Sequence, residues 1–202
     1  MKILLIISLL IVSIFANNIS KENKSNLLVN FSKLESNKKL EMISFMLNEK
    51  DFTSLDKVLL VTPFISSAIN ETSPISVCEL FKDASDKEKN FLSIGLWFSH
   101  SINKKTFMLL YDKDANVFIK SMEDNNVYTY LDLKIRNKTD LNTLWSTYFS
   151  SGNIKYLDKL VEVVFDDNLF LSTSAKNLFK QNSSIPSVKN YINDINLDLD
   201  KI

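Results

Sequence analysis

Cysteine is nearly absent from this sequence, since Cys78 is the only one in 202 residues. A single cysteine excludes an intramolecular disulfide, so the stability of the fold has to come from the packing of its core. Two interpretations of Cys78 stay open. It is a small apolar residue buried on a helix, as free cysteines commonly are, or it is a reactive thiol or an intermolecular bridge.

Glycine and proline are also scarce, with two glycines and three prolines. β-Sandwiches and β-barrels need turn residues about every 10 positions, so this scarcity argues against both. Apolar residues instead recur at helical spacing through most of the chain. The sequence therefore predicts an all-α fold, an irregular bundle or short stack of about seven to nine helices that includes a helix hairpin at about 139–165.

Charge of one sign does not predominate, because 24 basic residues balance 24 acidic ones. Proteins that bind nucleic acid carry a basic excess or a dense stripe of lysine and arginine. Arg136 is the only arginine, and lysine lacks the planar fork that grips phosphate in two places. We therefore expect no nucleic-acid partner.

Long apolar runs are missing after the N terminus. Lys2 precedes an apolar run, Ile3–Phe15, and Ala16 is a small residue suited to the position before a cleavage site. The run is shorter than the ~20 residues that a membrane-spanning helix needs. The pattern predicts a signal peptide at 1–16, with an uncleaved N-terminal anchor as the alternative.

The remaining chain divides into a polar, partly flexible N-terminal segment at 17–36 and a single helical domain at 37–202. We expect no membrane span in the mature chain, because no second apolar stretch approaches the necessary length. The protein is expected to be exported to the periplasm or secreted. The sequence leaves its oligomeric state open.

Prolines and capping residues mark the expected helix boundaries. Thr62-Pro63 and Ser73-Pro74 each place a capping oxygen before a proline, the preferred order at a helix start. In the hairpin, Thr139 is the expected cap and Gly152 the expected helix stop. Tyr128–Ile135 alternates weakly and is expected to be an extended loop or a helix. Helical segments are predicted at about 37–50, 63–70, 74–82, 85–99, 106–113, 116–122, 139–149, 154–165, 172–180 and 186–195.

His100 is the only histidine, and it could act as a general base. Its neighbours Ser99 and Ser101 cannot face it on a helix, so a favourable place at a helix end is the preferred interpretation. The carboxylate pairs Glu123-Asp124 and Asp166-Asp167 are neighbours in sequence rather than opposed across a cleft, as a glycosidase needs. No residue is therefore predicted as catalytic, cofactor-binding or metal-binding, and no cofactor is expected.

One segment matches part of the calcium loop of an EF-hand. The residues at its first, third, fifth and twelfth positions are Asp112, Asp114, Asn116 and Glu123. Position six is Val117 instead of the glycine that the turn needs, and position nine is Lys120, whose charge opposes the ion. We therefore predict no calcium site here.

The segment Leu144–Leu157 combines Leu-Trp, an aromatic pair and a Gly-Asn turn before a new helix. It resembles a motif of uncharacterised helical proteins of bacteria, mainly proteobacteria. Gly95–Ser99 is similar to that family's Leu-Trp-Leu-Ser segment, and Thr139–Leu141 to its helix entry. The resemblance covers about Phe64–Phe165 and departs at Ser151, where threonine is usual. It implies the helical fold and a bacterial origin, and no activity.

Aromatic residues are abundant, with fourteen Phe, six Tyr and two Trp. They fill the core of a domain without disulfides, or they line an apolar ligand cavity or a protein-binding groove. The leading hypothesis is a non-enzymatic module that binds another protein, and an exposed apolar patch would favour it. The alternative is a carrier of a small apolar ligand, which an enclosed aromatic-lined cavity would favour. A hydrolase with a site assembled from scattered residues is the third.

Overall fold

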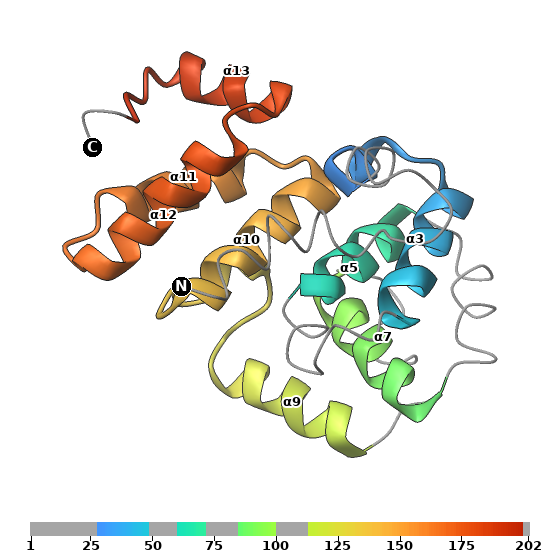
Figure 1. The fold of residues 1–202 in the computed structure, drawn as a ribbon. Coiled ribbons are helices and arrows are strands. Elements are labelled where there is room, and N and C mark those ends of the chain that lie inside the picture. The colour runs from blue at the N-terminus through green and yellow to red at the C-terminus, as the bar shows by residue number, and fades with distance from the viewer. Residues whose placement is uncertain (1–27, 49–59, 72–84, 100–112, 200–202) are drawn as a thin grey trace.

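The chain folds into helices only, over the part that the computed structural model describes, residues 28–48, 60–71, 85–99 and 113–199. These residues form eight α-helices and two short 3-10 helices, with no strand among them (Figure 1). The all-α prediction and the expected number of helices are confirmed. The elements are η1 (Phe31–Lys33), α3 (Ser36–Asn48), α5 (Thr62–Glu71), α7 (Asp86–Phe98), α9 (Lys113–Asp124), η3 (Tyr130–Asp132), α10 (Lys138–Ser151), α11 (Lys155–Val164), α12 (Leu169–Asn182) and α13 (Pro186–Asp194).

Several predictions concern residues outside this part of the chain. They are the signal peptide at 1–16, Cys78, His100, the helix at 74–82 and, apart from Lys113, the helix at 106–113.

Helix α10 lies at the centre of the molecule (Figure 1). Every residue at 141–150 is buried except Ser146, which is half-buried. The helix packs against α5 on one side and against α11 and α12 on the other. Its buried hydroxyls are satisfied internally, because Thr143 and Thr147 each donate to the carbonyl four residues earlier, at 3.0 and 2.7 Å. A helix buried all round is a core helix, and the two parts of the fold meet on it.

Helices α5 and α7 form the most extensive helix pair among the described residues. Gly95 of α7 lies where the two backbones approach most closely. A Cβ atom added there would lie 2.7 Å from the Cβ of Ile65 and 3.3 Å from the backbone nitrogen of Ser66. The glycine inside this helical pattern is therefore explained by the close crossing of α7 over α5.

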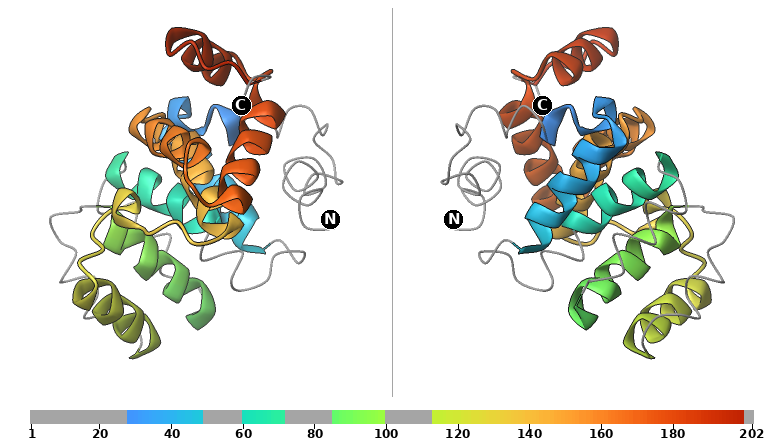
Figure 2. Two further views of the ribbon diagram at one scale, coloured as in Figure 1. Left: turned by 90° about the vertical axis from the view of Figure 1, so that its left-hand side faces the viewer. Right: turned by 90° about the vertical axis from the view of Figure 1, so that its right-hand side faces the viewer.

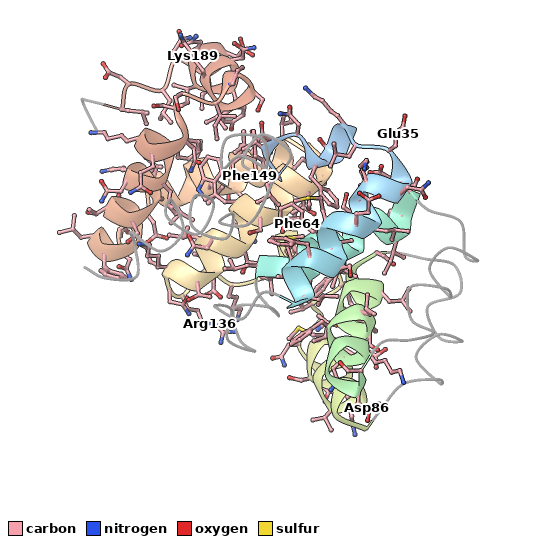
Figure 3. The ribbon with its side chains drawn as sticks, turned by 45° about the vertical axis from the view of Figure 1, so that its right-hand side comes forward. Glu35, Phe64, Asp86, Arg136, Phe149 and Lys189 are labelled. Carbon is pink, nitrogen blue, oxygen red and sulfur yellow. The ribbon has the colours of Figure 1, made fainter. Side chains whose placement is uncertain are left out.

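The packed core reaches further toward the N terminus than residue 37. Leu28 and Phe31 are buried in the main apolar cluster, Phe31 completely. The edge of the Phe31 ring meets the Phe64 ring, with centroids 4.8 Å apart. Phe64 and Phe149 lie in the interior, whereas the labelled charged residues lie at the periphery (Figure 3). The end of the segment predicted to be polar and partly flexible is thus part of the fold.

Lys39 of α3 is fully buried beside this N-terminal turn. Its ammonium is paired with the carboxylate of Glu71, the last residue of α5, and donates a hydrogen bond to the Ser32 carbonyl at 3.2 Å. It also lies 5.7 Å from the centroid of the Phe31 ring. One buried charge therefore joins η1, α3 and the end of α5.

The predicted helix hairpin is present, with one correction at its start. The cap of α10 is Asn137, whose side-chain oxygen accepts hydrogen bonds from Thr139 and Asp140 N–H groups, so the predicted cap Thr139 is wrong by two residues. Gly152 ends the helix in the left-handed conformation, with φ of 68°. The following α11 agrees with its predicted range within one residue at each end.

The segment at 128–135 forms no strand. It is extended apart from the turn of η3, which a capping box between Thr129 and Asp132 closes. Tyr130 stacks on Phe98, with ring centroids 4.1 Å apart, and its hydroxyl donates to the Thr62 hydroxyl at 3.0 Å. The weak alternation of the sequence reflects a loop anchored by one buried aromatic residue.

The C-terminal helix α13 and helix α9 lie at opposite ends of the molecule in both side views (Figure 2). Over the described residues, no helix combines the length and the apolar character that a membrane crossing requires.

Gly95→Ala should destabilise the protein by about 1–3 kcal/mol, because the added methyl group overpacks the crossing of α5 and α7. In an exposed helix the same change would stabilise by about 1 kcal/mol. The sign of the change in unfolding free energy therefore shows whether Gly95 lies in a close helix crossing. Equilibrium unfolding in urea measures the difference. Ser121→Ala on the exposed face of α9 is the control and should stay within about 0.5 kcal/mol of the wild type. A stabilised Gly95→Ala variant would contradict the close crossing.

Lys39→Met should lower the free energy of unfolding by about 2 kcal/mol. Removing one partner of a fully buried ion pair costs about 3–5 kcal/mol, and the cost is smaller here because water can still reach the Glu71 carboxylate. The adjacent Lys38→Met is the matched control. Lys38 pairs with Glu41 on the surface at 2.8 Å, and loss of that pair should change stability by less than about 0.5 kcal/mol. Equal effects of the two variants in urea unfolding would refute the buried role of Lys39.

Candidate functional site

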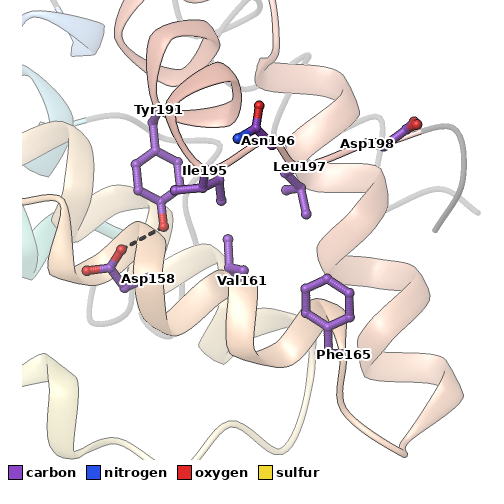
Figure 4. A pocket seen from close by; sticks show the side chains of 8 residues that line it. All are labelled: Asp158, Val161, Phe165, Tyr191, Ile195, Asn196, Leu197 and Asp198. Atoms are coloured by element: carbon purple, nitrogen blue, oxygen red, sulfur yellow. Dashed lines mark hydrogen bonds between the residues drawn. The ribbon is translucent and has the colours of Figure 1, made fainter.

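An open groove runs between α11, α13 and the chain that follows α13 (Figure 4). Its volume is about 520 Å³. Five of its lining side chains are aliphatic or aromatic, and they come from α11, from α13 and from the turn that follows α13. The residues that line it are Asp158, Val161, Phe165, Tyr191, Ile195, Asn196, Leu197 and Asp198.

Helix α13 packs against α12 and is tied to α11 by a hydrogen bond. Val188 is fully buried, and the Tyr191 hydroxyl donates to the Asp158 carboxylate at 2.7 Å. Burial raises the pKa of Tyr191 above its ordinary value, and the hydrogen bond and charge of Asp158 raise it further. The tyrosine therefore stays a neutral donor, and it fixes the spacing of the two groove walls.

The chain turns back at the end of α13 and closes one end of the groove. Asn196 adopts the left-handed conformation, with φ of 52°, which asparagine tolerates better than most residues. The N–H of Leu197 then donates to the Ile192 carbonyl at 3.0 Å, the long-range bond of a helix-ending turn. This turn places Leu197 in the groove and leaves Ile195 40% exposed.

Large apolar side chains are exposed where α11 ends and α12 begins. Phe165 is 63% exposed, Leu169 77% and Phe170 66%. Phe165 also lines the groove, so the other two continue its apolar surface around the turn between the helices. We call Phe165, Leu169 and Phe170 the apolar tip. Single exposed apolar residues are common on proteins, whereas here three lie close together in the sequence beside a groove.

Carboxylates lie beside the groove on α11 and just after it, and Asp158 is the one of them that lines it. Asp158, Glu162 and Asp166 recur every four residues and are exposed, and we call them the acidic edge. The spacing places Asp158 and Glu162 along one side of the helix, next to the apolar stripe formed by Val161 and Phe165. Asp166 lies just beyond the end of α11, where its carboxylate accepts a hydrogen bond from a backbone N–H of the turn. The groove therefore has an apolar floor and a negative flank.

The one lysine within this stretch of α11 is directed elsewhere. Lys159 donates hydrogen bonds to the carbonyls of Leu131 and Leu133, the latter at 2.9 Å, and so ties η3 to α11. Burial lowers the pKa of Lys159, although the carboxylates of Glu162 and Asp132 act in the opposite direction. Its ammonium therefore binds the loop before α10 and does not neutralise the carboxylates beside the groove.

A second concavity, of about 420 Å³, lies between α5, α10, α11 and η3, and its lining is polar and apolar in similar parts. Its hydroxyls are largely committed to the backbone. Ser67 donates to the Ser150 carbonyl and Ser151 to the Thr147 carbonyl, each at 2.6 Å. Asn70, Asn153 and Lys155 add amide and ammonium groups to its lining. The predicted alternative of a carrier would favour a more enclosed and more apolar cavity than this one.

The residues that the sequence analysis weighed as catalytic or metal-binding do not form a site within the described part of the chain. His100, Cys78 and Asp112 lie outside the described residues. The rest of the calcium-loop match lies within the continuous helix α9, which excludes the looped geometry of an EF-hand. Glu123, Asp124, Asp166 and Asp167 are exposed at helix ends, as expected. In the described part of the chain, no three His, Cys, Asp or Glu residues form a cluster that could hold a metal ion.

The groove and the apolar tip were not predicted. Phe165 has the spacing of a core residue, and Leu169 and Phe170 precede the predicted start of their helix at 172. Helix α12 begins three residues earlier because Asn168 caps it, accepting a hydrogen bond from Leu171 N–H. The signal that could have shown the site is the alternation of carboxylates and apolar residues along α11.

Tyr191→Phe should loosen α13 and cost about 1–2 kcal/mol in urea unfolding, because it removes a hydrogen bond to a charged group. The wild-type pKa of Tyr191 is raised by folding, so the bond stabilises fully below pH ~10, the ordinary tyrosine value, and is lost as pH rises through the higher folded value. The difference between wild type and variant should therefore shrink only at strongly alkaline pH.

Tyr128→Phe is the control for this comparison, since Tyr128 is 48% exposed and lies away from α13. It should change stability by less than about 0.5 kcal/mol at neutral pH. If both variants behaved alike, the Tyr191 hydrogen bond could not be what fixes the groove walls.

No protein-family model, no curated protein and no solved structure matches this chain.

Proposed function

We propose that this protein is an exported, non-enzymatic interaction module that binds another protein through the groove and the apolar tip. The observation that carries the proposal is the exposure of Phe165, Leu169 and Phe170, each more than 60% exposed, beside a groove with an apolar floor. A domain without disulfides gains stability by burying such side chains, so leaving three of them in water at one place favours an interaction role.

The shape of the groove favours a protein segment over a small molecule. Sites for small ligands enclose most of the ligand surface, whereas this groove is open along its length and continues onto the apolar tip. The concavity between α5, α10, α11 and η3 is half-open and has a mixed polar and apolar lining. Neither is the enclosed aromatic-lined cavity that would favour a carrier. The proposal of export comes from the N-terminal pattern at 1–16 alone.

Site-specific photocrosslinking in the cells that make the protein tests the proposal. A benzophenone amino acid is placed at Phe170 in the full chain, with the same group at Val117 as the matched control. Val117 is also an exposed apolar residue, at 70%, but lies on α9, which Figure 1 shows apart from α11 and α12. We expect a discrete adduct with one protein from position 170 and none from position 117.

A second variant ties the adduct to the groove. Phe165→Asp in the Phe170 crosslinking background should reduce the adduct at least about tenfold, because a buried charge at an interface centre costs several kcal/mol. Phe165 is largely exposed, so its thermal unfolding should shift little. Adducts of equal yield from positions 170 and 117, or an adduct indifferent to Phe165→Asp, would refute the proposed site.

A further inference from the structure

The acidic edge and the apolar floor together define the chemistry of the groove's partner. This inference rests on the function proposed above. Asp158 lines the groove beside Val161 and Phe165, and Glu162 follows it one turn later on the same side of α11. Asp166 is exposed in the turn after the helix. From Asp158 to Glu162 the helix rises by about 6 Å, or roughly one helical turn. The surface is thus an apolar strip with a row of negative charges along it.

The opposite wall repeats this pattern with fewer charges. Ile195 and Leu197 supply the apolar side chains, and Asp198 lines the groove beside them. Asp194 is exposed next to Ile195. The lysine of this wall, Lys189, is two residues from Tyr191 and therefore lies on the opposite face of α13, and it projects from the outer side of the molecule (Figure 3).

We propose that the groove binds an amphipathic helix of the partner protein that carries lysine or arginine along the borders of its apolar face. Apolar side chains of that helix would fill the groove floor, and its cations would meet the acidic edge. Binding of a helix in a groove leaves the backbone hydrogen bonds of the partner satisfied within its own segment. Binding of an extended strand would need a sheet edge, and the described residues contain no strand.

The same charges argue against other occupants. In a symmetric dimer formed through this groove, the acidic edge of one copy would face that of the other, and like charges brought together in an interface repel. An anionic membrane surface would be repelled in the same way. A basic amphipathic helix is the occupant whose charge and shape both complement the groove.

Peptide binding to the purified protein tests this inference. The probe is a fluorescein-labelled peptide of leucine and lysine, about 14 residues long and so about four helical turns, with the leucines on one face. One control peptide has glutamate for every lysine, and another has the basic composition in scrambled order. Fluorescence anisotropy should show saturable binding of the basic amphipathic peptide, at least about tenfold tighter than either control peptide.

Charge reversal locates the binding. The double variant Glu162→Lys, Asp166→Lys should weaken binding of the basic peptide about tenfold or more and should improve binding of the acidic one. The double variant Glu123→Lys, Asp124→Lys changes the net charge equally at the end of α9, and it should bind as the wild type does. All four positions are exposed, so both variants should stay folded. Loss of the hydrogen bond from Asn168 N–H to Asp166 should cost the first variant about 0.5–1.5 kcal/mol, which melting measurements check.

The outcomes separate this inference from the proposed function. Equal weakening by the two double variants, or equal binding of the basic and acidic peptides, would refute the inference that the groove binds a basic helix. The proposed function would survive that result if the Phe170 crosslink still depended on Phe165. If the basic peptide shows no saturable binding and the crosslink is also missing, both proposals fall.

Discussion

The burial of α10 on every side is the constraint on which the rest of the structure depends. This helix separates α3, α5 and α7 from α11 and α12, and a chain with one cysteine has no internal disulfide to hold the two sets together. A buried hydroxyl without a partner costs about 1–3 kcal/mol, and Thr143, Thr147 and Ser150 avoid that cost by donating to carbonyls of their own helix. Ser67 of α5 then donates to the Ser150 carbonyl, which fixes the end of α10 from which α11 departs. The wall of the groove is therefore positioned from the core.

The parts of the fold that could be predicted are those fixed by local chemistry. The hairpin at 139–165 is specified by helical periodicity and by Gly152, which ends α10 at positive φ. Pro186 likewise begins α13 where its missing N–H is harmless. The roles of Gly95 and Lys39 could not be predicted from the sequence, because each depends on contact with an element that is distant along the chain. Gly95 makes room for α5, and Lys39 is buried only because η1 and the end of α5 close around it.

The groove was beyond prediction for a related reason. Apolar spacing on a helix is the same for a buried face and for a face kept for a partner, so Val161 and Phe165 carry no mark of their exposure. Whether these side chains are exposed depends on α13, which contacts α11 through Tyr191 and leaves the end of α11 open. The carboxylates of the acidic edge were visible in the sequence, but their significance depends on which apolar residues lie beside them in space.

Magnitudes decide how the groove can work. Complete burial of a large apolar side chain contributes about 1.5–3 kcal/mol, so the three residues of the apolar tip, already partly buried, contribute roughly 3–6 kcal/mol. Association itself costs an estimated 4–15 kcal/mol in lost freedom of movement. The tip therefore cannot sustain a complex unaided, and the groove floor has to be filled as well. The acidic edge adds modest energy at the rim and acts mainly on the rate and orientation of encounter, an effect that salt weakens. Apolar contact supplies the attraction, and the carboxylates select which helix can use it.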